Sequence, residues 1–242
     1  ANAMNVTSTA RSTTLEGNGA QVITTEHLLA AFMGLSVDNA LVEIDNVEIP
    51  ILDGSSKPYT DAISSDGICE QNAERKYLEI KTPFTYEEDG RSITIRPSDK
   101  YEIEVHIDFS SKVVGQQIAT FTLEEGNFAK EIGCCRTFCF FHEIEFLMAH
   151  NLIKGGDIDN AIVIVEHEPA SESVEKLKTL FDIHNLEVKV GYLNNLTLHY
   201  ENECACHKRL YVMGDFALTG MPSVSLLPFM VIELAVYGLV SG

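Results

Sequence analysis

The chain has 242 residues, of which 45% are hydrophobic, enough to bury the core of one large domain or two small ones. Its formal charge at pH 7 is −19, from 36 acidic against 17 basic side chains. That charge disfavours a nucleic-acid partner, and an anionic substrate would need a local basic pocket. The six cysteines have no regular spacing, which predicts reduced thiols in a cytoplasmic protein.

Neither end of the chain has the pattern of an export or membrane-spanning segment. Residues 1–20 are polar and rich in Thr, Ser and Asn, unlike a signal peptide. Val224–Val240 is apolar, but Pro228 and Glu233 interrupt it and it is short for a span. We therefore expect membrane contact to be peripheral at most. The alternative, an anchor at Val224–Val240, would be exposed by sedimentation with lipid.

The first third of the chain predicts a small α+β unit. In order, the patterns indicate an extended start, a helix, a hairpin and a short helix: 1–19, Thr24–Gly34, 39–52 and Lys57–Ile63. A polar, glycine-bearing stretch follows at 64–72, and we place a domain boundary near residue 73.

The remainder of the chain predicts a second α+β unit. Three strand-like runs indicate an antiparallel meander: Tyr77–Tyr86, Ser92–Arg96 and Tyr101–Phe109. A helix, a strand, a helix, a strand and a last helix are then expected: Phe128–Asn151, Asn160–Glu166, Glu172–Phe181, Leu186–Leu193 and Glu203–Leu218. The first of these helices is expected to be broken, or to start, around Gly133. The pattern favours an α+β fold of two layered domains, 1–73 and 74–222. We expect the apolar tail at 223–242 to pack poorly.

One helix start places a carboxylate beside an imidazole. Thr24 or Thr25 can cap this helix, so Glu26 and His27 lie in its first turn. Small side chains on the same face leave the imidazole room for a partner, and a metal ion is one such partner. A capped core helix with a satisfied polar pair explains the same residues.

The last helix carries a second candidate set. His207, Tyr211 and Asp215 stand at positions i, i+4 and i+8, so they point to one side of the helix, with Lys208 adjacent. A second histidine with an acid or phenol one turn on is how tetrahedral zinc sites are assembled from separate elements.

Two further motifs give weaker signals. Cys204, Cys206 and His207 could be soft metal ligands, but Cys-x-Cys-His without a second pair is a poor zinc signature. Arg136–Phe138 sets polar groups in an otherwise apolar run, and taken alone it favours an exposed helix turn.

Together these motifs resemble the zinc-dependent UDP-3-O-acyl-N-acetylglucosamine deacetylases of lipid A synthesis. The similarity covers residues 5 to 222, and it is strongest to the Bacteroidetes type, which is often fused to a 3-hydroxyacyl carrier-protein dehydratase. We expect no dehydratase half within these 242 residues. The blocks that carry the resemblance are Thr-Thr-Glu-His-Leu-Leu-Ala-Ala at 24–31, Asp-Asn-Ala-Leu-Val-Glu-Ile at 38–44, Ile-Pro-Ile-Leu-Asp-Gly-Ser-Ser at 49–56, Cys-Arg-Thr-Phe at 135–138, Ile-Lys-Gly-Gly-Asp-Ile-Asp-Asn-Ala-Ile-Val at 153–163, and His-Lys at 207–208 followed by Gly-Asp-Phe-Ala-Leu at 214–218.

The resemblance implies that paired helices of each domain lie sandwiched between two sheets, with the site between the domains. It implies Zn²⁺ as the cofactor, UDP-3-O-acyl-N-acetylglucosamine as the substrate, and hydrolysis of its acetamide to acetate and a free amine. The implied roles are zinc ligation by His27 and His207, general base for Glu26, oxyanion donor for Thr137, positioning of the carbonyl for Lys208, packing on the sugar for Phe138, and orientation of a histidine general acid for Asp215.

The sequence differs from the family pattern in four places. Tyr211 stands where the family has an aspartate as the third zinc ligand, and Cys206 stands where it has arginine. Ser223–Gly242 contains no histidine where the family has a Gly-His-x-x-Asn block, and the family's opening β segment would precede Asn5. The alternative is therefore a non-catalytic homologue that keeps a nucleotide-sugar or acyl-chain pocket. Zinc content and acetate release discriminate the two.

Overall fold

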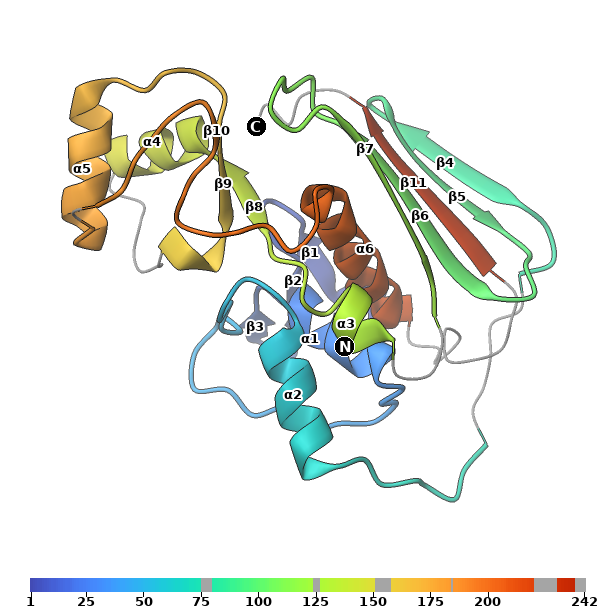
Figure 1. The fold of residues 1–242 in the computed structure, drawn as a ribbon. Coiled ribbons are helices and arrows are strands. Elements are labelled where there is room, and N and C mark those ends of the chain that lie inside the picture. The colour runs from blue at the N-terminus through green and yellow to red at the C-terminus, as the bar shows by residue number, and fades with distance from the viewer. Residues whose placement is uncertain (75–79, 124–126, 151–157, 184, 220–229, 238–242) are drawn as a thin grey trace.

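The computed structural model describes residues 1–74, 80–123, 127–150, 158–183, 185–219 and 230–237 (Figure 1). These residues form helices and several small sheets, which confirms the α+β class. The helices are α1 Glu26–Gly34, α2 Lys57–Asp66, α3 Phe128–Glu131, α4 Phe141–Ala149, α5 Ser171–Phe181 and α6 Glu203–Phe216, with 3₁₀ turns at Ala3–Asn5, Ile158–Asn160 and Ala217–Thr219. The strands are β1 Val6–Ser8, β2 Thr14–Gly17, β3 Ala20–Val22, β4 Phe84–Glu88, β5 Arg91–Arg96, β6 Tyr101–Asp108, β7 Gln116–Thr122, β8 Phe138–Phe140, β9 Ile162–Val165, β10 Gly191–Tyr192 and β11 Met230–Tyr237.

Helices α1 and α6 pack against each other at the centre of the molecule (Figure 1). Their backbones come unusually close at Gly214, where a Cβ atom would lie 2.3 Å from the carbonyl oxygen of Glu26. Ala30, Leu210 and Met213 are buried in the main core, and α6 also packs on β6 and β7. The close approach brings the first turn of α1 beside the middle of α6.

The largest sheet has the strand order β4-β5-β11-β6-β7. Along β6, every second residue is buried, because one face of the sheet packs on α6. β11 lies between β5 and β6, antiparallel to the first and parallel to the second. In the predicted meander, the pairing of the first two strands as β4 and β5 is confirmed, but the direct pairing of β5 with β6 is wrong, because β11 lies between them.

The same strand corrects the expectation for the tail. Residues 223–242 were expected to pack poorly, but Met230–Tyr237 pair on both sides, with Glu233 opposite Thr94 of β5 and Glu104 of β6. The segment has no proline and is rich in apolar and β-branched residues, a composition that suits a central strand. The rest of the tail lies outside the described residues.

A second, smaller core forms around the sheet β10-β9-β8. The strand expected at Asn160–Glu166 and the helix expected at Glu172–Phe181 are confirmed as β9 and α5. The strand expected at Leu186–Leu193 is reduced to Gly191–Tyr192. Leu177 of α5 and Val165 of β9 are fully buried in this core.

Three further expectations concern the segments at 128–151, at 39–52 and near residue 73. The helical run expected over Phe128–Asn151, broken or started around Gly133, forms two helices, α3 and α4, so the break around Gly133 is confirmed. The strand β8 that lies between them was not expected; there the N–H of Thr137 donates to the carbonyl of Gly54 at 2.7 Å. The hairpin expected at 39–52 does not form; the structure has only a single parallel bridge there, between Ile23 and Glu48. The boundary expected near residue 73 adjoins 75–79, which are outside the described residues.

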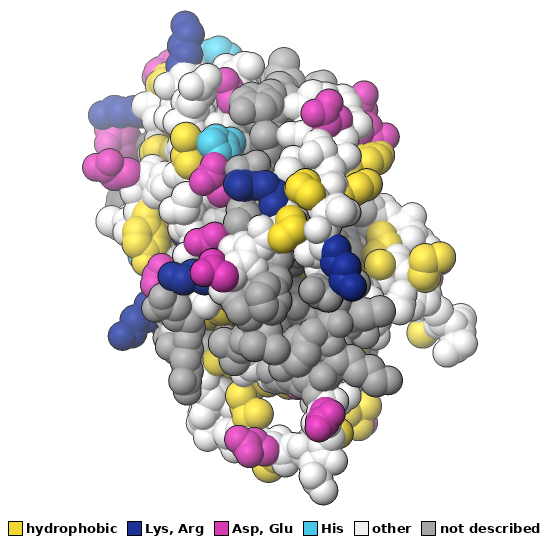
Figure 2. Space-filling model, turned by 90° about the vertical axis from the view of Figure 1, so that its right-hand side faces the viewer, with side chains coloured by type: hydrophobic (Ala, Val, Ile, Leu, Met, Phe, Trp, Pro, Cys, Tyr) yellow, Lys and Arg dark blue, Asp and Glu magenta, His cyan; other side chains and the backbone are white. Residues whose placement is uncertain are grey.

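The surface agrees with the acidic composition. On the face shown in Figure 2, basic side chains are scattered among acidic and apolar ones rather than gathered in one patch. Within the described ranges, no helix has both the length and the apolar character needed to cross a membrane.

Candidate active site

The start of α1 does not use the threonine cap that the sequence suggested. Thr25 occupies the cap position, but its side chain makes no capping hydrogen bond. Its hydroxyl donates to the carbonyl of Thr13 at 3.3 Å, and the hydroxyl of Thr24 donates to Glu48 at 2.9 Å. The capping prediction is wrong because both hydroxyls tie the helix start to neighbouring segments. Ser56 also donates to the carbonyl of His27, at 2.7 Å.

Two buried imidazoles face each other across the α1–α6 contact. The ring centroids of His27 and His207 are 5.2 Å apart, and both side chains are almost completely buried. Nδ1 of His207 lies 3.0 Å from the carbonyl oxygen of Cys135, which fixes Nδ1 as the protonated nitrogen and leaves Nε2 as an acceptor. Nε2 of His207 and Nδ1 of His27 have no partner among the described residues.

These two nitrogens fit a metal ion. Burial lowers the pKa of His27 to about 4 and lowers the pKa of His207 well below 6.5. Both imidazoles are therefore neutral near pH 7, and a neutral imidazole is the form that binds metals. Buried polar atoms without a partner are rare and costly, so a ligand for this pair is expected on physical grounds.

Tyr211 completes the ring cluster but is a poor third donor. Its ring centroid lies 4.5 Å from that of His207 and 5.7 Å from that of His27. Its hydroxyl is 3.2 Å from the hydroxyl of Thr137, and burial raises the pKa of Tyr211 to about 12. Across the described ranges, no three His, Cys, Asp or Glu side chains converge as a metal set. The donor set here is two imidazoles and a neutral phenol.

The two carboxylates lie next to the imidazoles and share one partner. The backbone N–H of Thr13 donates to Oε1 of Glu26 at 2.7 Å, and its hydroxyl donates to Oδ1 of Asp215 at 2.9 Å. Oε2 of Glu26 is buried and has no partner in the described structure. Burial raises the pKa of both Glu26 and Asp215, and Lys208 partly opposes this. A buried carboxylate with a free oxygen suits proton transfer.

Lys208 is the basic side chain close to Glu26 and Asp215. Its Nζ lies 5.2 Å from the ring centroid of Phe138 and 4.8 Å from that of Tyr211, within cation–π range of both rings. Burial lowers its pKa, whereas Asp215 and Glu26 are among the neighbours that raise it. Lys208 can therefore donate to an oxygen that gains charge between these rings.

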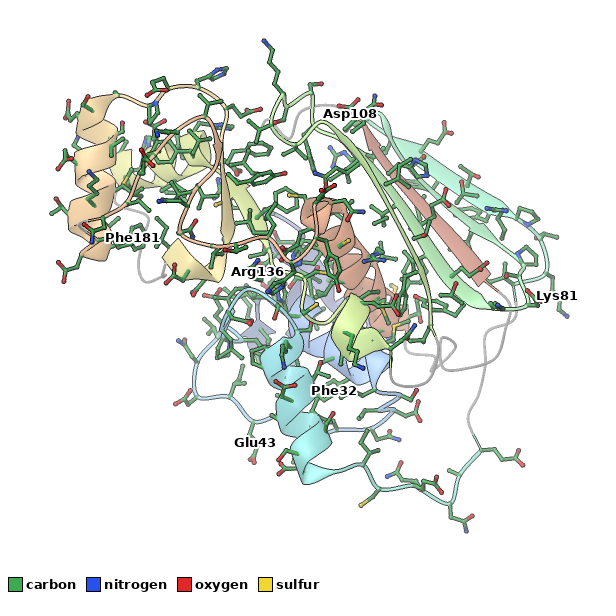
Figure 3. The ribbon with its side chains drawn as sticks, viewed as in Figure 1. Phe32, Glu43, Lys81, Asp108, Arg136 and Phe181 are labelled. Carbon is green, nitrogen blue, oxygen red and sulfur yellow. The ribbon has the colours of Figure 1, made fainter. Side chains whose placement is uncertain are left out.

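A buried ion pair holds the segment that carries Thr137 and Phe138. Nε and Nη2 of Arg136 donate to the two carboxylate oxygens of Glu203 at 3.0 and 3.1 Å, and the backbone N–H of Arg136 donates to the same carboxylate. Arg136 is 7% exposed, so the exposed helix turn expected at Arg136–Phe138 is wrong. Figure 3 shows Arg136 in the interior, between α6 and β8, the strand that follows Arg136 in the chain.

The structure thus brings together the eight residues that the family resemblance placed in the site. They are Glu26, His27, Thr137, Phe138, His207, Lys208, Tyr211 and Asp215. Cys204 and Cys206, the other ligand candidates on α6, are buried in the main apolar core. Sequence reasoning missed Thr13, the carbonyl of Cys135 and Glu203, because two of these contacts use backbone groups and none has a local motif.

A cavity of about 650 Å³ lies on another face of α1. Leu28, Leu29 and Phe32 line it, together with residues of β2 and β3. Neither His27 nor Glu26 lines it, so this cavity is separate from the imidazole pair.

The fold and the site define an α+β protein with a buried centre of two imidazoles and two carboxylates, the kind of side-chain set that metal-dependent hydrolases use. The chain belongs to the UDP-3-O-acyl N-acetylglycosamine deacetylase family, whose model matches residues 1–181. The family resemblance of the sequence motifs is thereby confirmed.

Named relatives extend the match to α6. The chain is 40% identical over 221 residues to the bifunctional enzyme LpxC/FabZ of Bacteroides thetaiotaomicron, covering 90% of this chain and 48% of that protein. It is 42% identical over 220 residues to the enzyme of the same name from Porphyromonas gingivalis, covering 89% and 47%. It is 40% identical over 222 residues to the UDP-3-O-acyl-N-acetylglucosamine deacetylase of Saccharophagus degradans, covering 91% and 66%. The chain therefore spans about half the length of the bifunctional relatives.

Proposed function

We propose that this protein is a zinc-dependent hydrolase that removes the N-acetyl group of UDP-3-O-acyl-N-acetylglucosamine, in the cytoplasmic pathway of lipid A biosynthesis. Family membership and the names of the relatives support the substrate and the reaction. The observation that carries the proposal is the pair of buried imidazole nitrogens without a partner in the described structure, beside the free Oε2 of Glu26.

His27 and His207 would hold the ion, and Tyr211 stands where a third ligand belongs. When bound, zinc supplies Lewis-acid chemistry, which lowers the pKa of a water molecule to about 7 and polarises an amide carbonyl. The neutral state of both imidazoles and the hydrogen bond that orients His207 suit this role.

Glu26 supplies the proton transfers in this proposal. Its free Oε2 takes a proton from the attacking water as the new C–O bond forms. When the C–N bond breaks, Glu26 returns that proton to the leaving nitrogen, which departs as an amine while acetate remains. Burial raises the pKa of Glu26, which favours holding the proton until it is returned to the leaving nitrogen.

The remaining site residues bind and orient the substrate. Lys208 and the hydroxyl of Thr137 are placed to donate to the carbonyl oxygen as it gains negative charge. Phe138 offers a ring face for packing on the sugar, and Asp215 favours the charged form of Lys208. We propose no nucleic-acid partner for this acidic surface, and at most peripheral contact with the membrane that holds lipid A precursors.

Acetate release from UDP-3-O-acyl-N-acetylglucosamine, measured with and without added zinc, tests the proposal. We expect zinc-dependent release from the full chain and a loss of roughly 10²–10⁴-fold in Glu26→Gln. Glu48→Gln is the matched control, because Glu48 accepts a hydrogen bond from Thr24 outside the site. Equal turnover by Glu26→Gln, or no acetate from the wild-type chain with zinc, would contradict the proposal.

A further inference from the structure

Thr13 connects the two acidic residues of the site. It is 5% exposed and lies at the end of the loop between β1 and β2, directly before Thr14. Its backbone N–H donates to Oε1 of Glu26 on α1, and its hydroxyl donates to Oδ1 of Asp215 on α6. One buried residue therefore gives each carboxylate a donor.

The two hydrogen bonds have different consequences. Because Oε1 of Glu26 is occupied, the partnerless Oε2 is the oxygen left to exchange a proton. The hydroxyl favours the ionised form of Asp215, and so does Lys208 on the same helix. Glu26 faces Asp215 from α1, with Thr13 hydrogen-bonded to both side chains. Thr13 stands between two groups that would otherwise repel each other.

We propose that Thr13 is a positioning residue, which holds Glu26 and Asp215 in fixed orientation at the meeting of α1 and α6 so that Oε2 of Glu26 and the charge of Lys208 face the reacting amide. The proposal rests on the proposed function for its catalytic consequence. The geometric part, one donor to each carboxylate, does not depend on the reaction.

Thr13→Val removes the hydroxyl and keeps the size and the backbone N–H, and Thr13→Ser keeps the hydroxyl. With zinc and saturating UDP-3-O-acyl-N-acetylglucosamine, we expect Thr13→Val to lower kcat about tenfold or more with little change in KM, because a hydrogen bond to a charged group is lost. Thr13→Ser should restore kcat to within about threefold of wild type. Thr14→Val is the matched control: it makes the same substitution at the next residue, in β2, and should keep wild-type kcat.

Wild-type kcat in Thr13→Val would overturn the proposal. An equal loss in Thr13→Ser and Thr13→Val would also overturn it, because the hydroxyl would then not be what matters.

A second readout does not need turnover. In protein labelled with ¹³C at the aspartate carboxyl carbons, Asp215 should titrate at a higher pH in Thr13→Val than in wild type, and Thr13→Ser should restore the wild-type value. An unchanged Asp215 titration in Thr13→Val would overturn the role of Thr13. If the titration moves as expected but the wild-type chain releases no acetate with zinc, the proposed function fails and the positioning of Asp215 by Thr13 stands.

Discussion

In the proposed zinc site, Tyr211 is the residue that most limits how tightly a metal ion is held. The phenol lies among the imidazole rings and has a pKa of about 12, so it is neutral at pH 7. A phenol must lose its proton to become a good anionic ligand, and that cost weakens binding. The two imidazoles of His27 and His207 would then hold the ion almost alone.

Replacing this phenol by a carboxylate should tighten zinc binding. We expect Tyr211→Asp to raise zinc affinity tenfold or more in competition with a chelator, since even groups that only orient metal ligands are worth about 10- to 100-fold. Tyr211→Phe, which removes the hydroxyl alone, should leave zinc affinity near the wild-type value. Unchanged affinity in Tyr211→Asp would show that position 211 does not face the metal.

The buried histidine predicts a pH dependence of stability with a definite sign. Burial lowers the pKa of His27 from 6.5 to about 4, so the unfolded chain takes up a proton before the folded one does. This stabilising contribution is complete above pH 6.5 and is lost as the pH falls toward 4, by roughly 3 kcal/mol for the whole shift.

Urea unfolding of the metal-free protein at pH 7 and pH 4.5 measures this contribution. The wild-type chain should lose more unfolding free energy between these pH values than His27→Gln, which cannot take up the proton. Equal losses in the two proteins would mean that His27 is accessible to solvent. Adding zinc should protect the wild type at pH 7 and not the variant.

At the scale of single elements, the contact between α1 and α6 is what assembles the site. Each helix brings one imidazole and one carboxylate, and the helices can approach only because Gly214 has no side chain. A Cβ there would lie 2.3 Å from the carbonyl oxygen of Glu26, a backbone atom that cannot rotate away.

Gly214→Ala should therefore destabilise the protein even though alanine favours helices by about 1 kcal/mol over glycine. We expect a net loss of roughly 1–3 kcal/mol in denaturant unfolding, because the two helices must separate. Gly17→Ala is the control, since its Cβ would meet only the end of the Asn5 side chain, at 3.2 Å. A stability gain in Gly214→Ala would contradict the close helix contact.

At the scale of the whole molecule, β11 joins the end of the described chain to the middle of the largest sheet. It has a strand on each side, whereas β4 lies at the sheet edge. Removing a central strand would leave two hairpins, β4-β5 and β6-β7, without a connection through the sheet.

Hydrogen exchange tests this arrangement. Amides of Met230–Tyr237 should exchange as slowly as those of β6, and amides of β4 should exchange faster because edge and terminal strands open more easily. If Met230–Tyr237 exchange faster than β4, the tail does not occupy the centre of the sheet.

Local pattern predicted the elements that have a clear period or a start signal. The helical spacing of His207, Tyr211 and Asp215 placed them together on α6, and the apolar run at β9 predicted its strand. The position of β11 could not be predicted, because its parallel pairing with β6 joins segments more than a hundred residues apart in sequence. The formation of β8 depends on the distant carbonyl of Gly54, and the role of Thr13 depends on its backbone N–H.

The amount of zinc bound per chain at saturation tests the central claim most directly. In equilibrium dialysis followed by metal analysis, the wild-type chain should bind about one zinc ion, and His27→Ala and His207→Ala should each lose it. A melting curve of each variant separates metal loss from unfolding. If His27→Ala binds as much zinc as the wild type, the paired imidazoles are not the metal site and the account is wrong.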